Sequence, residues 1–132
     1  MKTILFACVH NAGRSQMASA FFNGMANRAI VTSVSAGTRP AERVHPVVVT
    51  AMKEVGLDLS EVRPQLFSAD MAKDAELLVT MGCEEECPVV PGVRREDWQI
   101  SDPAGQTVER VREVWEEIRD RVQKLLTKEG WA

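Results

Sequence analysis

Short apolar segments of strand length alternate with segments of helical periodicity along this chain of 132 residues. The predicted strands cover residues 3–7, 30–35, 77–80 and 98–100, and the predicted helices cover residues 15–26, 45–55, 66–73 and 107–126. Such alternation favours a parallel sheet with helices on both faces. We therefore predict an α/β fold, a doubly wound four-stranded parallel sheet, in a single domain spanning residues 1–132.

Two segments anchor this prediction. The first strand is a nearly continuous apolar run, which is typical of a strand buried on both faces. The last helix, capped by Thr107, carries a stripe of apolar residues at helical spacing: Val108, Val111, Trp115, Ile118, Val122 and Leu125. Trp131 follows that helix, and we expect it to be peripheral. Ligands of such sheets bind beyond the carboxyl ends of the strands, which points to the loops beginning at Cys8, Met81 and Ser101.

Composition and charge exclude several classes of function. The net charge of −3 gives no general attraction to nucleic acid or to an anionic membrane. No apolar run approaches the roughly 18 residues of a membrane helix, and the first strand is not followed by the cleavage pattern of a signal peptide. The three cysteines are too few for a disulfide framework. We expect reduced thiols, a cytoplasmic location, and neither a nucleic-acid nor a membrane partner.

No cofactor or metal site is expected. The only histidines are His10 and His45, so a four-ligand zinc site would need Cys8 or carboxylates as well.

The most informative loop follows the first predicted strand. It reads Cys8-Val9-His10-Asn11-Ala12-Gly13-Arg14-Ser15. Backbone N–H groups in a tight loop can converge on an anion, and the N-terminus of the following helix adds about half a positive charge. Ala12 and Gly13 allow a tight turn, and the planar guanidinium of Arg14 can hold two oxygens of a tetrahedral oxyanion. We predict that an oxyanion binds to Val9, His10, Asn11, Ala12, Gly13 and Arg14.

Cys8 stands at the start of this loop, where the same positive field favours the thiolate over the thiol. The hydroxyl group of Ser15 can donate a hydrogen bond to that sulfur. A thiolate facing a bound oxyanion is a nucleophile directed at phosphorus or arsenic. We therefore predict catalytic roles for Cys8, Arg14 and Ser15.

The pattern Cys-x5-Arg-Ser directly after the first strand resembles the low-molecular-weight protein tyrosine phosphatase superfamily, and within it the arsenate reductases that share this fold. The likeness extends over nearly the whole chain, through residues 8–18, 35–38, 44–46, 79–83 and 102–103. Many relatives carry a second cysteine just before the loop arginine, where this chain has Gly13. The resemblance therefore gives no support for a disulfide within the loop.

The third loop supplies a carboxyl group at Asp102. Pro103 biases Asp102 toward an extended conformation. A carboxylic acid above the loop of residues 8–15 (the anion loop) could protonate an oxygen leaving a phosphate ester or arsenate. Tyrosine phosphatases of this family usually follow the Asp-Pro pair with tyrosines. Here Ala104 and Gly105 follow, and the chain contains no Tyr, which favours a small inorganic oxyanion over phosphotyrosine.

The second loop contains two cysteines, Cys83 and Cys87. The resemblance to thioredoxin-coupled arsenate reductases implies a relay. Cys8 holds an arsenic adduct, Cys83 attacks the Cys8 sulfur as arsenite leaves, and Cys87 then forms a disulfide with Cys83. The best-known relatives space this pair more widely, and some relatives use a small thiol and only the first cysteine.

The function predicted from the sequence is the reduction of arsenate to arsenite for arsenic detoxification, with thioredoxin as the reductant. One alternative reductant is a small thiol with a glutaredoxin-like protein. A second alternative is phosphomonoester hydrolysis through a Cys8 phosphoenzyme. A third is a non-enzymatic protein that binds arsenite or another oxyanion through the three thiols, which would leave Arg14 and Asp102 without a role.

Overall fold

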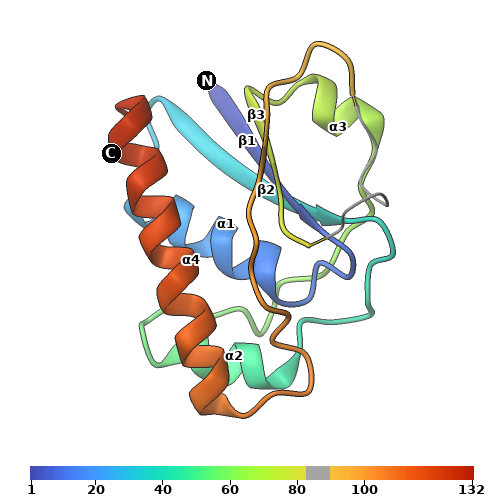
Figure 1. Ribbon diagram of the computed structural model, residues 1–132, viewed down its shortest axis with the longest axis vertical. Helices are drawn as coiled ribbons and strands as arrows, with labels where there is room; N and C mark the ends of the chain where they lie inside the picture. The colour runs from blue at the N-terminus through green and yellow to red at the C-terminus, as the bar shows by residue number, and fades with distance from the viewer. Residues whose placement is uncertain (83–89) are drawn as a thin grey trace.

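The computed structural model describes residues 1–82 and 90–132. The elements are β1 (Lys2–Cys8), α1 (Arg14–Met25), β2 (Val31–Gly37), α2 (Pro46–Lys53), α3 (Ala69–Lys73), β3 (Leu77–Thr80), β4 (Arg95–Asp97) and α4 (Val108–Glu129). Within these described ranges the strands form one four-stranded sheet in the order β2-β1-β3-β4, with every neighbouring pair parallel (Figure 1). The predicted doubly wound parallel sheet is confirmed.

Alternate residues of β1 point to opposite faces of the sheet, as the period of a strand requires. Ile4 and Phe6 join the larger core, which the sheet shares with α1, α2 and α4. Leu5 and Ala7 join a smaller core on the other face, beneath the segment that contains α3. Burial on both faces explains the continuous apolar run of β1, and each large side chain buried there contributes about 1.5–3 kcal/mol.

The fourth strand lies earlier than the sequence pattern suggested. We expected it at residues 98–100, but the residues paired with β3 are Arg95, Glu96 and Asp97. Because β4 is an edge strand, its charged side chains can remain partly in solvent. Trp98 and Ile100 are buried in the core just beyond the strand, so their apolar character reflected core packing and not sheet pairing.

The end of α4 also corrects an expectation. The helix runs past residue 126 to Glu129, and Gly130 then takes a left-handed conformation, with φ of 73°, as is common after a helix. This turn brings Trp131 back onto the core with 5% of its surface exposed. Its ring lies 6.3 Å from that of Phe22, and its carbonyl oxygen accepts from the Asn27 N–H. Trp131 is therefore a core residue, and the expected peripheral position was wrong.

The carboxyl ends of the strands place three loops at one edge of the sheet. β1 leads into residues 9–13, β3 leads into Met81 and Gly82, and the segment after β4 leads to residues 100–106. Both chain termini lie toward the opposite edge, near the start of β1 (Figure 1). No helix within the described ranges is long and apolar enough to cross a membrane.

Candidate active site

The loop after β1 leads into the N-terminus of α1, where no side chain caps the first backbone N–H groups of the helix. Gly13 precedes the first residue of α1 and offers no side chain to cap the helix, and the first turn of α1 contains no acidic residue. The first N–H groups of a helix have no partner within the helix. Together with the positive end of the helix dipole, they form a place for an anion.

Hydrogen bonds to the neighbouring segment fix the shape of this loop. The backbone N–H groups of Thr38, Arg39, Ala41 and His45 donate to the carbonyl oxygens of Cys8, Val9, His10 and Ala12, respectively, over 2.8–3.2 Å. These bonds hold carbonyl oxygens, which would repel an anion, on the side of residues 38–45. The loop also lies directly on Gly37, where an added Cβ would stand 2.6 Å from the Val9 carbonyl oxygen. The loop is therefore held in one conformation before any ligand binds.

A chain of buried side chains leads from Asn11 to the sulfur of Cys8. The backbone N–H of Gln65 donates to Asn11 Oδ1 over 3.0 Å, which assigns the other end of the amide as the donor. Asn11 Nδ2 then donates to Ser15 Oγ over 2.8 Å. Ser15 Oγ lies 2.9 Å from Cys8 Sγ. Either the Ser15 hydroxyl or the Cys8 thiol can donate in this contact, and when Cys8 is a thiolate only Ser15 can donate.

Only 2% of the surface of Cys8 is exposed, and the Ser15 hydroxyl group is a hydrogen-bond partner of its sulfur. A hydrogen bond donated to the thiolate favours the charged form, and so does a helix N-terminus. Asn11 itself adopts a left-handed conformation with φ of 51°, which asparagine tolerates better than most residues. The loop thus holds a sulfur suited to nucleophilic attack beside donors suited to an oxyanion.

Arg14 and Asp102 come together from distant parts of the chain. Arg14 Nη2 lies 3.7 Å from Asp102 Oδ2, with the arginine side chain 10% exposed and the aspartate 50% exposed. Arg14 Nη1 also donates to the Ile100 carbonyl oxygen over 3.3 Å. Since Asp102 is half exposed, the pair adds little to stability, but it places a carboxyl group beside the cation that would hold an oxyanion.

Gly82, which follows β3 after one intervening residue, also lies beside Arg14. Gly82 has φ of +79°, and an added Cβ would stand 2.0 Å from Arg14 Nη1. Only the absence of a side chain allows the guanidinium to lie against this backbone. Cys83 and Cys87, the two further cysteines predicted to take part, lie outside the described residues.

The structure therefore brings together Cys8, Arg14, Ser15, Asp102 and the loop residues between Val9 and Gly13. Three contributors had no such role in the sequence prediction: Gln65, which orients Asn11; Gly82, which makes room for Arg14; and His45, whose ring lies near Gly13. Gly82 stands two residues after the buried strand β3 and within the segment 79–83 of the family resemblance, and these were the signals that could have singled it out.

His45 and His10 occupy the rim of the site. Burial lowers the pKa of His45, the negative charge of Asp102 opposes that change, and the positive charge of His10 reinforces it. His10 is exposed, and its Nδ1 lies 3.1 Å from the Arg39 carbonyl oxygen.

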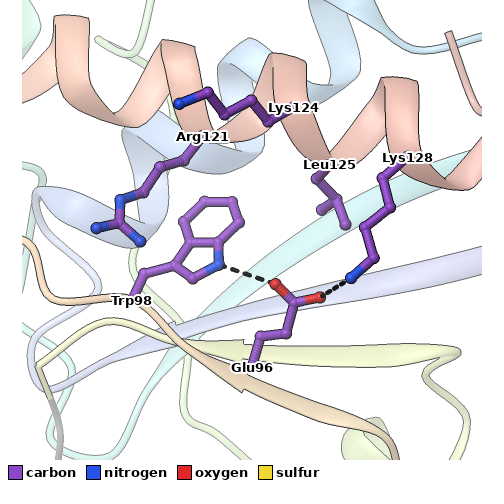
Figure 2. A pocket seen from close by; sticks show the side chains of 6 residues that line it. All are labelled: Glu96, Trp98, Arg121, Lys124, Leu125 and Lys128. Carbon is purple, nitrogen blue, oxygen red and sulfur yellow. Dashed lines mark hydrogen bonds and ion pairs between the residues drawn. The ribbon is translucent and has the colours of Figure 1, made fainter.

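A separate cleft of about 190 Å³ lies between β4 and the C-terminal half of α4 (Figure 2). Its lining residues are Glu96, Trp98, Arg121, Lys124, Leu125 and Lys128. Lys128 lies 3.8 Å from Glu96, which also accepts from the Trp98 indole N–H. Arg121 and Lys124 pair with carboxylates of their own helix. With its cations paired in this way, the cleft is a poorer anion site than the loop after β1.

No metal site was found in the part of the chain that the structure describes, where no group of three or more His, Cys, Asp or Glu side chains is placed to hold an ion.

Comparison with known proteins identifies relatives along almost the entire chain. The family described as low molecular weight phosphotyrosine protein phosphatase matches residues 3–129. A protein of Halobacterium salinarum, provisionally named an arsenate reductase, is 41% identical over 124 residues, which cover 91% of this chain and 87% of that protein. A Synechocystis protein named glutaredoxin arsenate reductase is 35% identical over 132 residues, covering 97% of this chain and 98% of the relative.

A solved structure shares the fold closely. It is a thioredoxin-dependent arsenate reductase of Corynebacterium glutamicum, which is 35% identical and superimposes with a TM-score of 0.83. The match covers 97% of this chain and 61% of that one.

Proposed function

This chain belongs to the low molecular weight phosphotyrosine protein phosphatase family, and from that premise we propose that it is an arsenate reductase acting through the thiol of Cys8. The observation that carries the proposal is the buried sulfur at the N-terminus of α1, with Ser15 Oγ 2.9 Å away and Asn11 donating to that oxygen. Relatives that match this chain over nearly its whole length are named arsenate reductases.

The first chemical step joins sulfur to arsenic. Arsenate binds to the loop N–H groups and to the guanidinium of Arg14. The Cys8 thiolate attacks arsenic, an S–As bond forms and an As–O bond breaks. Asp102 gives a proton to the leaving oxygen, which departs as water or hydroxide. Arsenic is still pentavalent in this adduct.

The second step transfers two electrons. The thiolate of Cys83 attacks the Cys8 sulfur, an S–S bond forms, and the electron pair of the S–As bond passes to arsenic. Trivalent arsenite leaves, and Cys8 and Cys83 are oxidised to a disulfide. Support comes from Gly82, which precedes Cys83 in the chain and contacts the guanidinium of Arg14.

The last step restores Cys8. The thiolate of Cys87 attacks Cys83, releasing Cys8 and leaving a Cys83–Cys87 disulfide, which an external dithiol reduces. We propose thioredoxin as that dithiol, in keeping with the thioredoxin-dependent relative. A glutaredoxin-like protein with a small thiol is the alternative, in keeping with the relative from Synechocystis. Because the cycle starts from three reduced thiols, we place it in the cytoplasm.

Hydrolysis of phosphomonoesters is a second candidate activity. Cys8, Arg14 and Asp102 would suffice for it, because a Cys8 phosphoenzyme needs no further thiol. The sequence disfavours phosphotyrosine as the substrate, since Ala104 and Gly105 follow Pro103 and the chain contains no Tyr. The two activities therefore differ in their need for Cys83 and Cys87.

An assay coupled to thioredoxin, thioredoxin reductase and NADPH tests both candidates. We expect arsenate-dependent NADPH consumption by the wild type and none by Cys8→Ser, Cys83→Ser or Cys87→Ser. If the wild type turns over arsenate with neither thioredoxin nor a glutaredoxin and small-thiol system, the proposed function is wrong. Full turnover by Cys83→Ser would remove the relay. Rapid hydrolysis of an aryl phosphate that Cys83→Ser leaves unchanged would favour the phosphatase.

A further inference from the structure

Gln16 is a buried polar residue of α1 that takes no part in the steps proposed above. Only 4% of its surface is exposed. Because Gly13 is the N-cap, Gln16 is the third residue of the helix. At that position a glutamate or glutamine side chain can turn back toward the residues before the helix. Here it turns back to the anion loop, where Gln16 Nε2 donates to Asn11 Oδ1 over 3.0 Å.

The oxygen of the Asn11 amide therefore has two donors. The second is the backbone N–H of Gln65, also at 3.0 Å. Since an amide oxygen has two lone pairs, both are occupied. The nitrogen of the amide is left to donate to Ser15 Oγ over 2.8 Å. Asn11 has no exposed surface, so leaving its oxygen without a donor would be costly.

The orientation of this amide decides what the Ser15 hydroxyl group can do. With the amide nitrogen facing Ser15, the serine oxygen accepts, and its proton is available to a Cys8 thiolate 2.9 Å away. If the amide were rotated by half a turn, its oxygen would face Ser15 and compete with the sulfur for that proton. The rotated amide would also turn its nitrogen toward the donors of Gln16 and Gln65 and lose both hydrogen bonds.

The two donors to Asn11 come from different kinds of segment. Gln65 is exposed and belongs to the connection between α2 and α3, and connections vary more in position than the elements they join. Gln16 is buried, and it directly follows Ser15 in the same helix. Its donor therefore keeps a constant position relative to Ser15, the residue that the amide nitrogen must face.

A neutral side chain at this position also preserves the positive end of α1, whose first turn contains no acidic residue. Glutamate is common as the third residue of a helix, where it interacts favourably with the helix dipole. Next to Asn11 its carboxylate would accept and not donate, and its negative charge would oppose both the Cys8 thiolate and a bound oxyanion. Glutamine supplies the donor without the charge.

We propose that Gln16 is a positioning residue for the nucleophile. Its amide holds Asn11 in the orientation in which the Ser15 hydroxyl group can donate to the thiolate of Cys8. This role rests on the proposed function, in which that thiolate attacks the oxyanion. Gln16 acts through Asn11 and Ser15, so its removal should be felt first in the reactivity of the sulfur.

The first test compares two variants of similar side-chain length, Gln16→Met and Gln16→Glu. Gln16→Met loses the donor, so we expect alkylation of Cys8 by iodoacetamide at neutral pH to slow about threefold to tenfold. The pH profile of alkylation should shift to higher pH. Gln16→Glu adds a negative charge and should slow alkylation by more than about tenfold. It should also weaken the protection of Cys8 by inorganic phosphate, which Gln16→Met should retain.

Asn23→Ala is the matched control. Asn23 belongs to the same helix, and its amide oxygen accepts from the backbone N–H of Ser33 over 2.8 Å and from the Ser33 hydroxyl group over 3.1 Å. The control therefore loses side-chain hydrogen bonds of α1 that do not lead to the sulfur. Alkylation of Cys8 in the folded control should proceed at the wild-type rate, and slowing equal to that of Gln16→Met would overturn the proposal.

A double-mutant comparison separates positioning from general damage. In a Ser15→Ala background the connection to the sulfur is already broken, so Gln16→Met should slow alkylation by less than about twofold further. The full threefold to tenfold slowing in that background would overturn the proposal, and so would wild-type rates in both single variants of Gln16. If the wild type turns over no arsenate, the proposed function fails separately, because alkylation needs no substrate and still measures the effect of Gln16 on the thiolate.

Discussion

Ser15 connects the sulfur of Cys8 to the rest of the loop, because its hydroxyl oxygen accepts from Asn11 and lies 2.9 Å from Cys8 Sγ, to which it can donate when Cys8 is a thiolate. Ser15→Ala removes the donated hydrogen bond. A hydrogen bond to a charged group contributes about 1.5–3 kcal/mol, so we expect the alkylation of Cys8 by iodoacetamide at neutral pH to slow about tenfold or more. The rate is measured on the Cys8 peptide by mass spectrometry.

Ser19→Ala provides the control for that experiment. Ser19 is a buried serine of the same helix, and its hydroxyl lies 2.8 Å from that of Ser33. Ser15→Ala loses the buried hydrogen bonds to Cys8 and Asn11 and Ser19→Ala loses the one to Ser33, so both variants should lower the free energy of unfolding by about 1 kcal/mol or more. Only Ser15→Ala should slow the reaction of Cys8. Equal reaction rates in the two variants would show that Ser15 does not act on the sulfur.

Among the elements, β4 depends on a side-chain contact at the end of β3. The Thr80 hydroxyl donates to Asp97 Oδ1, and this hydrogen bond is the main cause that lowers the pKa of Asp97 below its ordinary value of 3.8. A carboxyl group whose pKa is lowered on folding stabilises the fold above its unfolded pKa. That contribution is lost as pH falls through the folded pKa.

Thr80→Val tests this link between the two strands. We expect the free energy of unfolding to fall by about 0.5–1.5 kcal/mol at pH 7. The difference from wild type should start to shrink as pH falls below 3.8, where Asp97 of the unfolded chain takes up a proton, and should be lost once pH has passed the lower pKa of the folded state. Urea unfolding at pH 7 and at pH 3 measures both values. A difference that stays the same at both pH values would mean that the carboxylate of Asp97 is not the stabilising partner.

A strand was predictable from the sequence where the residues that pair in the sheet are also the buried apolar ones. It was less predictable where the paired residues and the buried residues are different. β1 is buried on both faces and paired on both edges, so its apolar run identified it. β4 is an edge strand of charged residues, while the apolar Trp98 and Ile100 pack beyond it. The anion loop was recognisable because its chemistry is contiguous in sequence. The contacts of Asn11 with Gln65 and of Gly82 with Arg14 join distant segments and leave no local pattern.

At the scale of the whole molecule, the candidate active site and the packing around the chain termini lie at opposite ends of the sheet. Cys8, Ser15 and Arg14 lie at the carboxyl ends of the strands, whereas Trp131 packs in the core near the chain termini, against Phe22 and Asn27. This arrangement implies that stability can change at one edge while the geometry of Cys8, Ser15 and Arg14 stays the same at the other.

Trp131→Ala tests that separation. Removing a buried tryptophan side chain should lower the free energy of unfolding by about 3 kcal/mol, measured by urea denaturation. Trp131→Phe keeps most of the contact with Phe22 and should cost less. At low temperature and without denaturant, Cys8 in both variants should react with iodoacetamide at the wild-type rate, because its partners Ser15 and Asn11 are untouched. A slower reaction in the folded alanine variant would mean that packing at the terminal edge is transmitted along β1 to the thiol.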